Sequence, residues 1–141
     1  ILKKMAKLIT ADGEGATKLI TIQVNNAKTL SDADAIGKTL TNSPLVKTAI
    51  NGSDANWGRI ISAVGNSGAE FIPENVTIQF GDMPILGKDY SVLFDEDEAK
   101  KVLLEDEVTI TVDLKEGTEN ATWWTCDFSE QYIKINSSYR S

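Results

Sequence analysis

Residues 107–114 (EVTITVDL) decide the fold class of this chain. Val and Ile alternate with polar residues along the stretch, so one face of an extended segment is apolar and the other is polar. Most of its side chains are β-branched, and such side chains pack well on a pleated sheet. The stretch is therefore predicted to be a half-buried β-strand. Residues 120–127 are expected to pair with it as a hairpin across residues 115–118.

Further strands and several helices are predicted on both sides of this stretch. Alternation or short apolar runs predict strands at residues 17–24, 45–50, 75–80 and 84–86. Apolar residues at helical spacing predict helices at residues 1–9, 31–41 (with Ser31 as the cap), 56–64, 95–104 and about 129–137. The alternation of strands and helices indicates a layered α/β (α+β) fold, and 141 residues are enough for a single domain over residues 1–141.

The charge balance narrows the class of partner. With 14 basic and 21 acidic residues the formal net charge is −7, which repels nucleic-acid phosphates and anionic lipid headgroups. No apolar run approaches the roughly 20 residues that a membrane-spanning helix needs. We therefore expect a soluble protein whose partners are small molecules, with no nucleic acid and no membrane.

The chain contains no histidine and a single cysteine, Cys126. Within this chain, that composition excludes Ser-His-Asp and Cys-His catalytic arrangements, histidine-based zinc sites and intrachain disulfides. Cys126 stands among aromatic residues, so it is expected to be a buried small hydrophobe rather than a nucleophile. A lone cysteine agrees with a reducing compartment, and a cytoplasmic location is expected.

Two segments at opposite ends of the chain are candidate binding sites. Residues 12–18 (DGEGATK) place Glu14 between two glycines, where a ligand can approach the backbone closely. A plain surface turn explains the same pattern. Residues 132–141 (YIKINSSYRS) combine amide, hydroxyl and guanidinium groups, although chain ends are commonly frayed.

Residues 42–65 form a third segment that is dense in polar side chains. Structural roles explain much of it, because Asn56 is placed to cap a helix and Arg59 to pair with a surface acid. The acidic residues 95–98 match no ion-binding loop, so they are expected to form a solvated helix face.

Taken together, these segments resemble the C-terminal half of the ornithine acetyltransferase family, also called glutamate N-acetyltransferase. The resemblance covers essentially the whole chain and rests on motifs in the family's order: DGEGATK at residues 12–18, NSPLVKTA at 42–49, DANWGRI at 54–60, and WTCD at 124–127 followed by Ile135-Asn136 and Tyr139-Arg140. Residues 81–106 add little to it. Ala55 stands where proline is usual, residues 128–132 vary the family's sequence, and Ser141 replaces threonine but keeps a hydroxyl.

The resemblance implies the self-processing aminopeptidase/ornithine-acetyltransferase-like fold and a cytoplasmic enzyme of arginine biosynthesis. Such an enzyme moves acetyl from N2-acetyl-L-ornithine to L-glutamate through a threonine acyl-enzyme, without a metal or nucleotide cofactor. A self-cleaving precursor supplies α and β chains, and two copies of each form a heterotetramer.

The resemblance also assigns roles to residues of this chain. Glu14, Asn136 and Ser141 match the family's substrate-binding residues, while Lys47, Asn56 and Arg59 lie in family motifs as architectural support. The nucleophilic threonine and the oxyanion hole match nothing here. The chain is therefore expected to be the C-terminal portion of the β chain, with no catalytic residue of its own and no activity alone.

Two other interpretations stay open at this point. One is a stand-alone amino-acid-binding or interaction module, and the other is a related self-processing aminopeptidase. The acetyltransferase interpretation requires that Glu14 and the polar residues at the end of the chain meet in space. They would then form one wall of a pocket that other segments complete.

Overall fold

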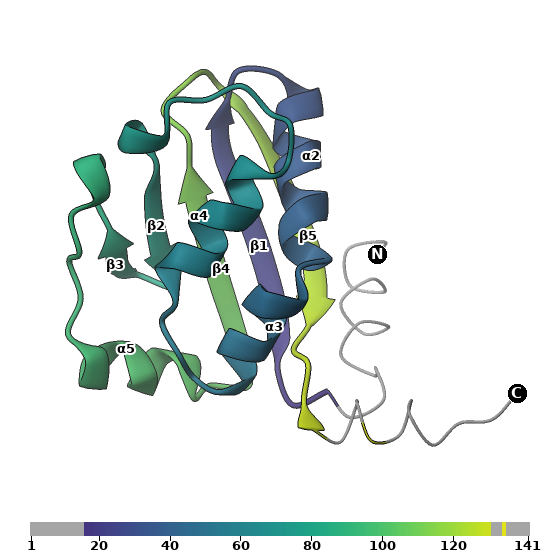
Figure 1. Cartoon of the computed structure of the whole chain (residues 1–141), viewed down its shortest axis with the longest axis vertical. Helices are drawn as coiled ribbons and strands as arrows, with labels where there is room; N and C mark the ends of the chain where they lie inside the picture. Colours follow the sequence, from purple (N-terminus) through teal and green to yellow (C-terminus); the bar gives the residue numbers. More distant parts are fainter. Residues whose placement is uncertain (1–15, 131–133, 135–141) are drawn as a thin grey trace, which may run out of the picture.

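A computed structural model describes residues 16–130 and residue 134 of the chain. Five strands form one sheet in the order β3-β2-β4-β1-β5 (Figure 1). The strands are β1 (Leu19–Ala27), β2 (Thr77–Phe80), β3 (Met83–Leu86), β4 (Glu107–Asp113) and β5 (Glu119–Cys126). The helices are α2 (Leu30–Thr41), α3 (Pro44–Asn51), α4 (Trp57–Gly65) and α5 (Glu96–Leu103), with short 3-10 helices η1 (Pro73–Asn75) and η2 (Lys88–Tyr90).

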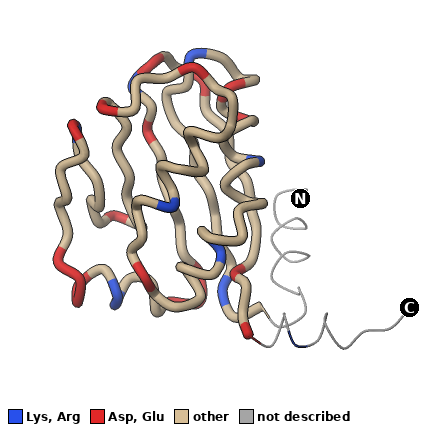
Figure 2. Tube along the Cα trace, viewed as in Figure 1, with Lys and Arg blue, Asp and Glu red and all other residues tan. Residues whose placement is uncertain are grey.

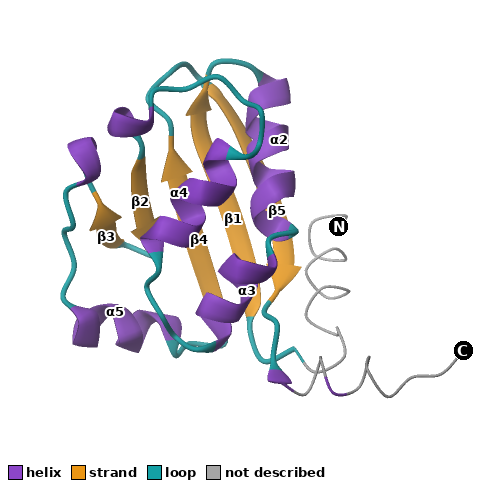
Figure 3. Ribbon diagram, in the orientation of Figure 1, coloured by secondary structure: helices purple, strands orange, loops and turns teal. Residues whose placement is uncertain are grey.

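Helices α2, α3 and α4 lie over one face of the sheet (Figure 3). Strand β1, which lies between β4 and β5, supplies that interface with Ile20, Ile22 and Val24, which are fully buried, while the alternate residues Thr21 and Gln23 are half-buried. The burial of side chains along β1 therefore alternates with the period of two residues that predicted this strand. The mixed α/β architecture expected from the sequence is confirmed, and so are the strands at β1, β2, β3 and β4 and the helices at α2, α4 and α5.

The expected hairpin between β4 and β5 is wrong. Strand β1 lies between them, paired in parallel with β4 and antiparallel with β5. The connection after β4 passes over the end of β1 instead of turning back on β4. Leu114 N–H donates to the Asn25 carbonyl at 3.0 Å, and the N–H groups of Glu116 and Gly117 both donate to the Asn26 carbonyl at 2.9 Å. These bonds satisfy the end of β1 and place the chain on its far side.

The expected strand at residues 45–50 is also wrong, because these residues belong to helix α3. Ser43 caps the helix by accepting a hydrogen bond from Val46 N–H at 3.3 Å, and Pro44 occupies its first turn, where proline is well tolerated. The buried residues Val46, Ala49 and Ile50 follow helical spacing. The short apolar run fits the period of a strand as well as that of a helix. The cap Ser43 and the following Pro44 favour the helix.

Smaller differences concern helix ends. Helix α2 is capped by Thr29, which accepts from Asp32 N–H at 3.0 Å, and not by Ser31. The expected helix at residues 1–9 lies outside the described residues, as does most of the one at 129–137.

Figure 2 shows acidic residues gathered at α5, and the acidic first turn of this helix is exposed as expected. In the part of the chain that the structure describes, no helix is long and apolar enough to cross a membrane.

Candidate functional site

The three predicted substrate-binding residues, Glu14, Asn136 and Ser141, lie outside the described residues. The structure does describe the chain that leads to two of them. Thr17 follows Glu14 by three positions, and Asp127 precedes Asn136 by nine. These two residues are in direct contact at the end of the sheet where β1 begins and β5 ends (Figure 1).

Asp127 is the centre of this contact, and its residue is fully buried. Its Oδ1 atom accepts the backbone N–H of Thr17 at 2.8 Å and that of Lys18 at 2.9 Å. Its Oδ2 atom accepts the Thr17 hydroxyl and the Asn51 side-chain amide, the latter at 2.8 Å. We call Thr17, Lys18, Asn51 and Asp127 the Asp127 cluster. It ties the start of β1, the end of α3 and the segment after β5 to one carboxylate.

Lys18 extends the cluster toward α3. Its Nζ atom donates to the Ile50 carbonyl at 2.7 Å and to the Ser53 hydroxyl at 2.8 Å. The Ser53 hydroxyl in turn donates to the Leu103 carbonyl at 3.4 Å. A buried ammonium therefore holds the turn after α3 against the start of β1.

Burial and hydrogen bonding act in opposite directions on the two charged groups. Burial lowers the pKa of Lys18, and the nearby Asp127 carboxylate offsets part of that effect. Burial by itself would raise the pKa of Asp127. The hydrogen bonds from Asn51, from Thr17 and from the two backbone N–H groups outweigh it, so the pKa of Asp127 lies below its ordinary value. The carboxylate is thus ionised at neutral pH.

This arrangement is suited to holding the backbone rather than to transferring protons. Both oxygens of Asp127 already accept two hydrogen bonds each, and a pKa below the ordinary carboxyl value makes this carboxylate a weak base. Beside the cluster, a surface pocket is lined by residues 16–19 together with Asp106 and Glu107.

The dense segment at residues 42–65 makes structural contacts. Asn56 caps α4 by accepting from Arg59 N–H at 3.2 Å, as expected. Arg59 pairs with no acid in the described structure; its Nη1 atom donates to the Leu45 carbonyl at 2.9 Å and so ties α4 to α3. The Lys47 ammonium lies 4.1 Å from the centroid of the Phe128 ring, next to Asp127.

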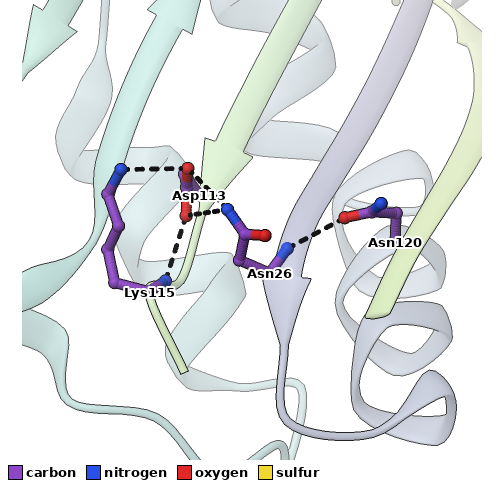
Figure 4. A network of polar contacts seen from close by, with 4 residues as sticks. All are labelled: Asn26, Asp113, Lys115 and Asn120. Carbon is purple, nitrogen blue, oxygen red and sulfur yellow. Dashed lines mark hydrogen bonds and ion pairs between the residues drawn. The ribbon is translucent and has the colours of Figure 1, made fainter. Parts of the chain in front are cut away.

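A second acid-centred network lies at the opposite end of the sheet, where β1 and β4 end (Figure 4). Asn26 Nδ2 donates to both oxygens of Asp113, at 3.1 and 3.0 Å, and Lys115 Nζ lies 3.1 Å from Asp113 Oδ2. Asn26 N–H donates to Asn120 Oδ1 at 3.0 Å. We call these four residues the Asp113 cluster. It is more open to solvent, since the Lys115 side chain is 53% exposed and that of Asp113 is 18% exposed.

Reasoning from the sequence missed the Asp127 cluster. The sequence predicts Asp127 only as the last residue of a strand, and it indicates no role for Asn51. One signal was present, since an acidic residue directly follows an apolar and aromatic strand and needs partners if it is buried.

Cys126 was expected to be buried, but the structure shows it half-buried. Among the residues that the structure describes, no group of His, Cys, Asp and Glu side chains is arranged to hold a metal ion.

Comparisons with known proteins give consistent relatives. The model of the ArgJ family matches residues 1–141. The arginine biosynthesis bifunctional protein ArgJ of Chlorobaculum tepidum is 50% identical over 141 residues, which are 100% of this chain and 35% of the relative. The protein of the same name from Caldanaerobacter subterraneus is 52% identical over 143 residues, covering 99% of this chain and 36% of the relative.

A solved structure agrees with the sequence relatives. The crystal structure of the arginine biosynthesis bifunctional protein ArgJ from Bacillus halodurans is similar with a TM-score of 0.92 and 43% sequence identity. The similarity covers 97% of this chain and 65% of that chain. The chain thus shares the fold of that protein, and it spans about a third of the length of the curated relatives it matches.

Proposed function

Because this chain belongs to the ArgJ family, we propose that it is one part of an acetyltransferase of arginine biosynthesis. The assembled enzyme moves acetyl from N2-acetyl-L-ornithine to L-glutamate. The chain is a single domain and forms the C-terminal portion of the β chain. The observation that carries the proposal is the Asp127 cluster, which joins the chain leading to Glu14 with the chain leading to Asn136.

The proposed reaction has two steps, and its nucleophile is a threonine outside this chain. The threonine hydroxyl attacks the acetyl carbonyl of N-acetylornithine, the amide C–N bond breaks, and the proton released by the hydroxyl passes to the departing ornithine amine. The glutamate amine then attacks the acyl ester, the C–O bond to the threonine oxygen breaks, and a proton from the amine passes to that oxygen, which yields N-acetylglutamate and the free threonine hydroxyl. Neither step uses a metal or a nucleotide.

In this scheme the present chain binds the amino-acid substrates. Glu14 pairs with a substrate ammonium group, such as the side-chain ammonium of N-acetylornithine, through a charge-assisted hydrogen bond. Asn136 and Ser141 orient the polar ends of the substrate without adding charge, which suits a pocket that admits both ornithine and glutamate derivatives.

The remaining parts of the active site belong to other segments of the longer protein. A precursor cleaves itself into α and β chains, and two copies of each assemble. The chain's coverage of 35% of a full-length relative supports an active site completed by other segments. A reducing compartment such as the cytoplasm suits the chain, because its single cysteine forms no intrachain disulfide.

Reconstitution tests the proposal. Co-expression of this chain with the remaining segments of a family protein should give acetyl transfer from N-acetylornithine to glutamate, and the chain alone should give none. Glu14→Gln in the assembled enzyme should raise KM by about 10- to 100-fold, since it removes a charged hydrogen-bond partner. The matched control is Glu74→Gln, an exposed residue of η1, which should leave KM unchanged. Equal KM for Glu14→Gln and the wild type would refute the assigned role.

A further inference from the structure

We infer that the face of the sheet turned away from the helices is the surface on which this chain docks against the rest of the family protein. The inference rests on the proposed function, because it names the surface that the assembled enzyme covers. Two adjacent rows of side chains form the centre of this face, and each row crosses strands β5, β1 and β4. We call these six residues the open sheet face: Trp124, Thr21 and Thr109 in one row, and Thr122, Gln23 and Thr111 in the next.

The helices leave this face uncovered. Successive side chains of a strand point to opposite faces of a sheet. The buried residues of all four helices form one core cluster with the inward residues of the strands, such as Ile22 and Ile110. On β5, Trp123 packs against this cluster and its neighbour Trp124 does not. Within the described residues, the helices therefore pack on the side opposite to the open sheet face (Figure 3).

The chemistry of the open sheet face is that of an interface rather than of a solvated surface. Charged residues make up 25% of the chain, yet all six residues of this face are neutral. The centres of protein interfaces are likewise depleted of charged side chains and enriched in aromatic ones. Thr109 is exposed and the other five residues are half-buried, so an approaching segment can reach them.

The open sheet face is also ordered, which lowers the cost of docking. Gln23 is held from both sides, because the Thr122 hydroxyl donates to its Oε1 atom at 2.6 Å and its Nε2 atom donates to Asn25 Oδ1 at 2.8 Å. Threonine side chains are β-branched and have few rotamers to lose. A surface that is ordered before binding loses less conformational entropy when a partner covers it.

Trp124 is the expected anchor of the contact. Its indole Nε1 atom is buried and has no hydrogen-bond partner in the described part of the chain. A buried donor without an acceptor is unfavourable, and a docked segment that offers an oxygen atom at this point removes that cost. Tryptophan is also enriched among the residues that dominate binding energy at interfaces.

The occupant that we assign to this face is a part of the family protein that lies outside this chain. The chain covers 35% of the relative from Chlorobaculum tepidum, so about two thirds of that protein remains to contact it. A second copy of this chain is the competing occupant. Each copy carries a formal net charge of −7, so two copies repel each other.

Insertion of a charge tests the inference in the assembled enzyme. The chain carries an affinity tag and is co-expressed with the remaining segments of a family protein, and the amount of those segments that co-purifies is measured. Thr111→Arg and Thr109→Arg should each lower this amount by about 10-fold or more, because each buries an unpaired charge in the contact. The matched control is Thr39→Arg on α2, a half-buried threonine on the helix side, which should change it less than about 2-fold.

Trp124→Phe keeps an aromatic ring but removes the indole N–H. It should lower co-purification by about 3- to 10-fold, and it decides the test if neither arginine variant folds. Co-purification at the wild-type level in any of the three variants that folds, or an equal loss in Thr39→Arg, would overturn the inference. So would self-association of the chain that Thr111→Arg abolishes while the other segments still co-purify. An assembly that forms but transfers no acetyl group would instead overturn the proposed function alone.

Discussion

The two ends of the sheet are built around similar groups but differ in burial. At the end where β1 begins, the fully buried Asp127 accepts four hydrogen bonds from residues far apart in sequence. At the other end, the partly exposed Asp113 is bonded to Asn26 and Lys115 around a tight connection. The Asp113 cluster closes the chain over the end of β1. The Asp127 cluster joins three segments, two of which lead to predicted substrate-binding residues.

The difference shows how the same chemistry serves two purposes. An exposed ion pair contributes little to stability because water and mobile ions screen it. A buried carboxylate that accepts hydrogen bonds from all of its donors fixes the relative positions of the segments that carry them. Its removal is costly because the buried donors then have neither a protein acceptor nor water to bond to. We therefore expect substitutions at the two ends to differ in size.

The largest effect is expected at Asp127. Asp127→Asn should lower the free energy of unfolding by about 2–3 kcal/mol, because it removes a buried charge and turns an amide toward the Asn51 amide donor. Chemical denaturation monitored by circular dichroism measures the change. A loss below about 0.5 kcal/mol would show that the donors find other partners.

The next effect is expected at the connection over β1. A Cβ atom at Gly117 would lie 2.5 Å from the Ala27 carbonyl oxygen, so Gly117→Ala should cost about 1–2 kcal/mol through displacement of the backbone. The control is Gly65→Ala, where no atom lies within 4 Å of the added Cβ and stability should stay equal or rise by up to about 1 kcal/mol. Thermal unfolding of both variants checks this pair, and an equal shift in Tm for both would argue against the close approach.

A smaller effect is expected at Asp113. Asp113→Asn should lower the free energy of unfolding by less than about 1 kcal/mol, because its ion pair with Lys115 is open to solvent. The loss should shrink further in high salt, whereas the loss in Asp127→Asn should not. Denaturation at two salt concentrations separates the two ends. A salt-insensitive loss at Asp113 as large as that at Asp127 would contradict the comparison.

The smallest effect is expected on acidification below about pH 4. The pKa of Asp127 is lower in the folded than in the unfolded chain, so its stabilising effect is complete above the unfolded pKa of about 3.9 and is lost as the pH falls through the folded pKa. The stability difference between the wild type and Asp127→Asn should therefore be constant from pH 7 to about pH 5 and narrow below about pH 4. Denaturation curves across this range give the answer, and a difference that widens on acidification would reverse the assigned sign.

Local periodicity was enough to predict most of the fold. The alternation in residues 107–114 and the helical stripe that includes Trp57 and Ile60 are properties of neighbouring residues, and both elements were predicted correctly. Residues 45–50 were mistaken for a strand because so short an apolar run fits two periods. Strand order was missed for a different reason, since the insertion of β1 between β4 and β5 depends on pairing between distant segments.

The site was harder to predict than the fold for the same reason. Asp127 lies 110 residues from Thr17 and 76 from Asn51, and no local pattern links them. Family resemblance assigned Glu14, Asn136 and Ser141 to substrate binding, and these assignments remain predictions. The sequence does not show that Asp127 is buried, and the role of a carboxylate at the end of a strand depends on burial and on the hydrogen-bond donors around it.

A crystal structure of the assembled enzyme with bound N-acetylornithine tests most directly which end of the sheet is functional. We predict that the ligand lies at the end where β1 begins, with its ammonium group within hydrogen-bond distance of the Glu14 carboxylate and with Asp127 still bonded to Thr17 and Lys18. A ligand bound beside Asn26 and Asp113 at the opposite end would contradict the assignment.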